Sequence, residues 1–147
     1  MAVSNLLLLR SAVAGLIPAT WPAPLTTPSV HEGEVREANP ALPWVVWNVS
    51  LPDGAFRGEN ATTTAHRLTA TFTVAARSEA EASLILREIA LDVDGEQPVA
   101  IGWNCGALIP HQPPRVWPDS IDLAGASVRG FVGVASWRFV ATDLPTS

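Results

Sequence analysis

The chain has 147 residues, of which 48 % are hydrophobic and 16 % are charged, and its formal net charge is −5 at pH 7. This length fits one domain with a substantial core, and the apolar fraction excludes a disordered polymer, so we expect a single domain over residues 1–147. The basic residues are all arginine and are outnumbered by carboxylates, which disfavours a nucleic-acid-binding surface. The single cysteine, Cys105, excludes an intrachain disulfide framework and a zinc site built from several cysteines.

The first segment, NLLLLRSAVAGLI at residues 5–17, predicts an N-terminal helix over residues 1–17. Ser4 is placed to cap the helix, and Gly15 and Pro18 are placed to end it. The apolar residues repeat at helical spacing, as expected for a buried stripe: Leu6, Leu9, Val13, Leu16 and Ile17. The alternative is a signal peptide cleaved near Ala19, but no basic residue precedes the apolar run and Arg10 interrupts it. The run is too short to span a membrane.

Prolines punctuate residues 18–43 and predict an extended connector with a short strand at Val30–Val35. Trp44–Leu51 alternates like a strand, with Val45, Trp47, Val49 and Leu51 on one face. The turn signal Pro52-Asp53-Gly54 follows, and we expect a long, mobile loop over residues 53–64.

The clearest strand is predicted at Arg67–Arg77, where the core face carries Leu68, Ala70, Phe72, Val74 and Ala76. The opposite face is a threonine ladder formed by Thr69, Thr71 and Thr73, suited to solvent or to another subunit. Ser78 and Glu81 have the spacing of a capping box, which predicts a helix to about Asp92 that stops at Asp94-Gly95. Its buried stripe is Ala82, Ile85, Ile89 and Val93.

The C-terminal third predicts a short strand at Pro98–Trp103 and a final strand at Phe131–Thr142, followed by a polar tail at residues 143–147. The final strand is apolar on both faces, so we expect it to be central or covered on both sides. The segment Ala107–Pro118 is extended but cannot be a central strand, because proline cannot donate to a ladder. The predicted fold class is α+β: a mainly antiparallel sheet with an N-terminal helix and one central helix packed on it.

The chemistry-bearing residues form no recognisable catalytic or ligand-binding motif. His66, Cys105 and His111 lack the close spacing of zinc ligands, and nothing near Cys105 in sequence offers a base. The carboxylate pairs Asp92–Asp94 and Asp119–Asp122 favour turns over acid–base catalysis. We therefore predict no catalytic residue, no metal and no cofactor; a small enzyme that uses Cys105 or the aspartate pairs stays as an alternative. The six tryptophans favour buried contacts, including contacts with other copies of the chain.

The order of several segments resembles tail terminator (minor tail) proteins of long-tailed phages of actinobacteria. These segments are PWVVWNVSLP at residues 43–52, DGAFRGEN at 53–60, HRLTATFTVAARSEAEASLILREI at 66–89 and SWRFVAT at 136–142. They follow an amphipathic N-terminal helix, and the composition, rich in Ala, Val, Pro, Trp and Arg, suits a GC-rich genome.

The resemblance implies a structural virion protein without catalytic activity. Such proteins assemble in the host cytoplasm and form a ring, a homohexamer, at the head-proximal end of the phage tail. The ring contacts the tail tube protein and the head–tail stopper or connector protein. DNA passes through it without specific binding, and no membrane is involved. The candidate contact residues are Arg57 and Glu59 in the loop and Thr69, Thr71 and Thr73 on the polar strand face. The alternatives are another head–tail joining or tail-completion protein, or a secreted binding module if residues 1–19 are a signal peptide.

Overall fold

The computed structural model describes residues 3–22, 25–33, 42–50, 56–57, 64–123 and 126–143. Two helices, α1 (Val3–Ala14) and α2 (Glu79–Val93), accompany strands β1 (Ser29–Glu32), β2 (Trp44–Val49), β3 (Phe56–Arg57), β4 (Thr64–Ala76), β5 (Trp103–Cys105), β6 (Ile109–Leu123) and β7 (Ala126–Asp143). The described strands form one sheet with the order β1-β2-β4-β7-β5, in which β3 pairs with β4 and β6 pairs with β7. The predicted α+β class is confirmed.

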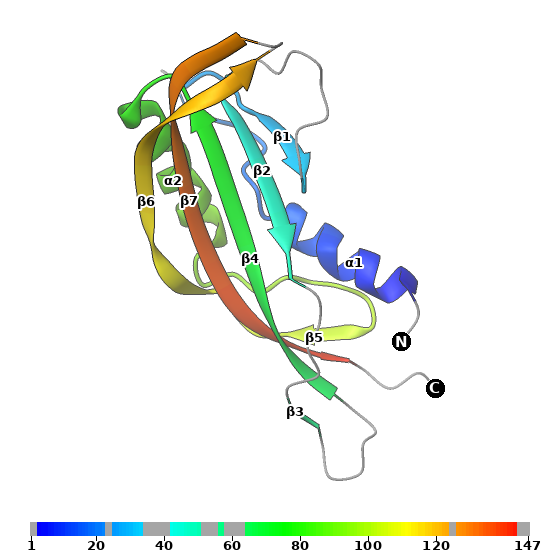
Figure 1. Cartoon of the computed structure of the whole chain (residues 1–147). Coiled ribbons are helices and arrows are strands. Elements are labelled where there is room, and N and C mark those ends of the chain that lie inside the picture. The colour runs from blue at the N-terminus through cyan, green and yellow to red at the C-terminus, as the bar shows by residue number, and fades with distance from the viewer. Residues whose placement is uncertain are drawn as a thin grey trace.

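The sheet is antiparallel except for the parallel pair β1–β2. Its long strands β4, β6 and β7 are curled, and α2 lies against them (Figure 1). Strand β7 is central: β4 pairs along one edge, while β6 and β5 follow each other along the other edge. The prediction that the last strand is central is therefore confirmed, although β7 begins earlier than Phe131. It also includes Asp143, which was predicted in the tail and pairs with Trp103.

The proline-rich segment is part of the sheet. Residues 109–123 form β6, which pairs only with β7 among the described strands and is therefore an edge strand. An edge tolerates residues without an N–H group, and the register shifts between Pro110 and Gln112 and between Gln112 and Arg115 accommodate the prolines. The expectation that this segment is extended and not central is confirmed. The turn expected at Asp119 and Asp122 is wrong, because both residues lie in β6.

Other predicted boundaries were also wrong: the helix expected over residues 1–17 ends at Ala14, and the strand expected at Arg67–Arg77 is β4, Thr64–Ala76. The strand expected at Pro98–Trp103 starts only at Trp103, because Gly102 has a φ of +89° and turns the chain into β5. Arg57, expected in a loop, lies in β3 opposite Thr64 of β4. The strand expected at Val30–Val35 is β1, Ser29–Glu32, and it is followed by Gly33 with a φ of +76°.

The core lies on one face of the sheet and includes residues from both helices. Leu9 and Val13 of α1 and Ile85 and Ile89 of α2 belong to the same buried cluster as the inward-facing residues of the strands. These strand residues include Val45, Trp47, Val49, Leu68, Ala70, Phe72, Val74, Ala135, Trp137, Phe139 and Ala141. The period-two alternation predicted for β2, β4 and β7 is confirmed for these residues.

Helix α1 is anchored by Arg10, the residue that interrupts its apolar run. The Arg10 Nε and Nη2 atoms lie 2.9 and 2.7 Å from Glu32 Oε1 on β1. Nη1 donates to the Val49 carbonyl at 3.0 Å, and the guanidinium lies 5.8 Å from the Trp47 ring centroid. Ser4 lies inside α1 and is not its cap, because the helix begins at Val3. Among the described residues, neither helix has the length and hydropathy needed to cross a membrane.

Helix α2 starts with the predicted cap in a modified form. Ser78 Oγ accepts a hydrogen bond from the Glu81 N–H at 3.1 Å. Glu81 Oε1 accepts from the N–H of Arg77 at 3.0 Å, one residue before the partner expected in a capping box. The predicted stripe Ala82, Ile85, Ile89 and Val93 is buried, together with Leu86. Asp94 ends the helix and its Oδ1 accepts from Trp137 Nε1 at 3.2 Å, which ties this end to β7.

Candidate interaction surface

The face of the sheet opposite the core is covered by no described helix, and we call it the open face. It is defined by the outward residues of β2, β4 and β7 (Val46, Asn48, Arg67, Thr69, Thr71, Thr73, Val134, Ser136, Arg138 and Val140), which alternate with the core residues. Towards one end, Ala75 is buried against Leu42 and Trp44. Val46 and Ser136 on this face are also buried, and the other residues form a mixed polar and apolar surface that is partly or fully exposed.

The predicted threonine ladder lies on the open face. Thr69, Thr71 and Thr73 are each half-buried on β4, between fully buried core positions. Thr71 lies between Asn48 of β2 and Ser136 of β7, so hydroxyl and amide groups form a row across three strands. Thr73 lies beside Val46 and Val134, where the row becomes apolar. The ladder is thus placed as predicted, and whether it contacts another subunit stays a prediction.

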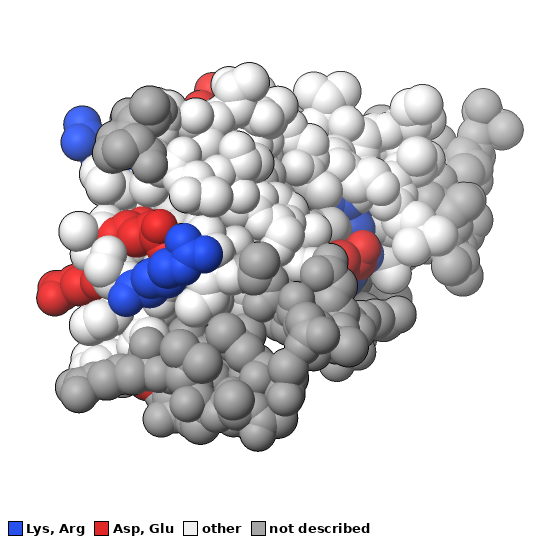
Figure 2. Space-filling view, turned by 90° about the horizontal axis from the view of Figure 1, so that it is seen from above, with Lys and Arg blue, Asp and Glu red and all other residues white. Residues whose placement is uncertain are grey.

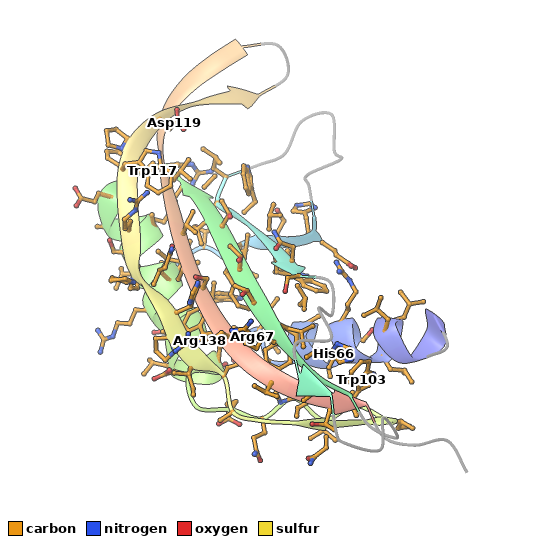
Figure 3. All side chains as sticks on the ribbon, turned by 60° about the horizontal axis from the view of Figure 1, so that its bottom comes forward. His66, Arg67, Trp103, Trp117, Asp119 and Arg138 are labelled. Atoms are coloured by element: carbon orange, nitrogen blue, oxygen red, sulfur yellow. The ribbon has the colours of Figure 1, made fainter. Side chains whose placement is uncertain are left out.

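Two arginines lie at the other end of the open face. Arg67 pairs with Val140 and Thr69 pairs with Arg138, which makes the two arginines diagonal neighbours on β4 and β7. Figure 3 shows them next to each other on these strands. A third arginine, Arg115 of β6, lies with its guanidinium 5.6 Å from the Trp117 ring centroid. Among the described residues, this end of the open face therefore carries two guanidinium groups, and β6 beside it carries a third together with the exposed Asp119.

A shallow apolar hollow of about 320 Å³ lies beside Arg67 and Arg138. Its other lining residues are Gly106, Ala107, Ile109, Phe139 and Val140. Ile109 and Val140 are 56 % and 41 % exposed, so two large aliphatic side chains face solvent beside two guanidinium groups. A cluster of exposed apolar groups with a polar rim is typical of a binding surface. A second, smaller hollow of about 90 Å³ involves Gln112, Arg115, Trp117 and Ser136. We refer to the larger one as the arginine-rimmed hollow.

The sequence did not identify the arginine-rimmed hollow. Alternation within SWRFVAT places Arg138 and Val140 on one face, which was the available signal. The hollow forms only when three strands pair in the correct register, which brings together Ile109, Arg67 and Arg138. No local sequence pattern specifies that register. Of the predicted loop residues, Arg57 pairs with Thr64 in β3, and its side chain lies outside the described part of the structure. Glu59 also lies outside the described residues.

The metal and nucleophile candidates are not brought together. His66 and Cys105 are both paired with Ala141, from opposite edges of β7, so a whole strand separates them. His66 is buried with its ring centroid 5.8 Å from that of Trp103, whereas His111 is exposed on β6. Burial raises the pKa of the Cys105 thiol above its ordinary value of 9.0, which disfavours the nucleophilic thiolate. In the described part of the chain, no three His, Cys, Asp or Glu side chains gather as metal ligands would.

Among the residues that the structure describes, several carboxylates lie on α2 and in the turn that follows it. Exposed or half-exposed acidic residues of α2 and the turn after it are Glu79, Glu81, Glu88, Asp92, Asp94 and Glu96. Charged groups are sparse on the side seen in Figure 2, where acidic and basic residues meet in two small groups separated by uncharged atoms. Arg77 and Arg87 are exposed on the α2 side, where the described carboxylates outnumber them. The open face carries Arg67 and Arg138, and β6 beside it carries Arg115 and Asp119.

In comparisons with known proteins, no protein-family model matches this chain, and no curated protein proves similar to it.

Proposed function

We propose that this chain is a structural virion protein of the tail-terminator kind, whose copies close into a ring that caps a phage tail tube. The observation that carries the proposal is the one-sided construction of the sheet. Both helices pack on one face, while the other face keeps exposed Ile109 and Val140 beside a threonine ladder and a group of arginines. Apolar side chains that are exposed among the described residues gain free energy when a partner covers them.

Two unlike faces suit a ring. When one face of a subunit contacts a different face of the next, each added copy repeats the same contact, and the series closes if the rotation fits. A closed ring leaves no unpaired subunit face around its circumference, so growth stops at a defined number of copies. On the end of a tube, such a ring ends polymerisation and offers a new surface to the head connector. In this function the chain acts through shape and contacts, without a reaction.

The experiment that tests the proposal measures assembly of the purified full-length chain. Sedimentation velocity and negative-stain images at increasing concentration are expected to show a closed ring of defined stoichiometry, a homohexamer, which attaches to one end of isolated tail tubes. A chain that stays monomeric at high concentration and leaves tube ends bare contradicts the proposal. Deleting the gene from its phage is expected to give tails of uncontrolled length. Tails of normal length that fail to join heads would instead indicate a head–tail joining protein.

A further inference from the structure

We propose that the arginine-rimmed hollow is the receptor for helix α2 of a second copy of this chain. This inference rests on the proposed ring function and specifies which two surfaces meet. The docking element is the outward stripe of α2, which we define as Leu84, Glu88, Leu91 and Asp92.

The outward stripe of α2 has the pattern of a second amphipathic face. Leu84 and Leu91 are one heptad apart and lie on the side of the helix opposite the buried Ile85, Ile89 and Val93. They are 38 % and 65 % exposed. Glu88 and Asp92 follow at helical spacing along one flank of these leucines, and Asp92 is exposed. The exposed Arg87 lies on the other flank of the two leucines, so it is the carboxylate flank that is suited to an apolar groove with a basic rim.

The hollow supplies the matching groups. Ile109, Val140, Gly106 and Ala107 make its lining mainly apolar, and Arg67 and Arg138 stand at its edge. A leucine of α2 placed against Ile109 and Val140 would remove exposed apolar surface on both copies. Arginine guanidinium groups bind carboxylates with paired hydrogen bonds, so Arg138 is a suitable partner for Glu88. Charge and hydrophobicity therefore match at the same positions.

The position of the two surfaces requires a contact between different copies. The outward stripe of α2 points away from the sheet on its helical side, whereas Arg138 and Val140 project from the open face. The sheet separates them, so a chain cannot dock its own α2 into its own hollow. After one such contact, the first copy still presents its stripe and the second still presents its hollow. The contact is therefore heterologous: it repeats from copy to copy, and it gives a ring where the rotation between copies closes.

The test uses charge reversal in the full chain and sedimentation velocity. The single variants Arg138→Glu and Glu88→Arg are each expected to weaken self-association by about tenfold or more, because each places like charges at the contact. An equimolar mixture of the two variants is expected to recover assembly, since every contact in an alternating ring then pairs opposite charges. Leu91→Glu is expected to abolish assembly, and no charge partner rescues it.

Matched controls reverse charges elsewhere on the surface. Arg77→Glu and Glu96→Arg change exposed residues outside the outward stripe and the hollow, and they are expected to assemble like the wild type. Circular dichroism and thermal unfolding check that each variant is folded. If the wild type forms a ring and the Arg138→Glu, Glu88→Arg and Leu91→Glu variants form it equally well, the proposed contact is wrong and the proposed function still stands. Variants that keep the ring but lose tube binding also overturn the contact, because the hollow would then receive the tube protein. A monomeric wild-type chain overturns both proposals.

Discussion

Gly133 of β7 lies directly against Leu86 of α2. A Cβ atom built on Gly133 would be 2.8 Å from Leu86 Cδ1 and 3.3 Å from Val116 Cγ2. Leu86 is 3 % exposed and borders a hollow of about 360 Å³, so an added methyl group would have to displace the Leu86 side chain towards that hollow. The absence of a side chain at this position sets the distance at which α2 packs on the sheet. A glycine in a central strand, which weakens a strand elsewhere, is here required by close approach.

We therefore predict that Gly133→Ala lowers the free energy of unfolding by about 1–2 kcal/mol, because an added methyl group overpacks this contact. Urea unfolding followed by tryptophan fluorescence measures the effect. Gly106→Ala is the matched control, since its new Cβ would have the Val140 carbonyl oxygen 3.5 Å away, an ordinary contact. The double variant Gly133→Ala, Leu86→Ala is expected to lose less stability than the sum of the two single variants, because Leu86→Ala removes the methyl group that the new Cβ would meet. A Gly133→Ala protein as stable as the control contradicts the packing described.

A second prediction concerns Arg10, which links α1 to β1 and β2. Arg10→Ala is expected to lower the free energy of unfolding by about 1 kcal/mol. The ion pair with Glu32 is partly exposed and contributes little, whereas the hydrogen bond to the Val49 carbonyl is half-buried and contributes more. Arg10→Lys should recover only part of this stability, since an ammonium group cannot serve both acceptors from one position. Hydrogen exchange of the α1 amides measures local release of the helix. Exchange unchanged in Arg10→Ala would show that apolar packing alone holds α1.

The cap of α2 gives a third prediction. Ser78→Ala removes the oxygen that accepts from the Glu81 N–H, and it is expected to lower stability by about 1 kcal/mol. Ser83→Ala changes an exposed serine of the same helix that has no capping role, so it is expected to be neutral or slightly stabilising. Thermal unfolding of both variants gives the comparison. Equal melting temperatures for the two variants would contradict the role of Ser78.

The fourth prediction concerns Cys105 and alkaline pH. Burial raises the pKa of its thiol above 9.0, so the folded chain holds this proton more tightly than the unfolded chain does. The contribution of this protonated thiol to stability is fully present below pH 9.0. It is lost as the pH rises from 9.0 through the pKa that the thiol has in the folded chain. In Cys105→Ala this alkaline loss is expected to be smaller. Unfolding free energies measured across this range test the sign, and identical pH profiles for the two proteins would contradict it.

The reactivity of the same thiol gives an independent check. A thiol reagent at mildly alkaline pH is expected to modify Cys105 slowly in the folded chain and rapidly after denaturation, because both burial and the raised pKa reduce the accessible thiolate. Rapid modification of the native protein would contradict the burial of this side chain.

Alternation was sufficient to predict β4 and the faces of β2 and β7, because each of these strands has one face in the core. Phe72 and Thr71, adjacent in sequence, lie on opposite faces of the sheet as their polarity indicates. The pattern was not sufficient for β6, where prolines interrupt every local signal and the strand exists through its pairing with β7. The pair of residues that forms β3 is likewise specified by tertiary contact with β4.

The candidate surface was predictable only in part, for the same reason. The threonine ladder follows from one strand, so sequence alone identified it. The arginine-rimmed hollow joins Arg67, Ile109 and Arg138, which come from three strands and meet only when the sheet register is known. Arg10 was noticed as an interruption of an apolar run, but its partners Glu32 and Val49 are far along the chain.

The prolines of β6 have a consequence for how copies of this chain behave when crowded. Pro110, Pro113, Pro114 and Pro118 are exposed along a strand whose only described neighbour is β7. A strand from another molecule needs a regular row of N–H donors in order to pair with an edge strand, and proline has no N–H group. This edge strand therefore resists fibrillar aggregation. Contacts made there must use side chains, which discriminate between partners better than backbone pairing does.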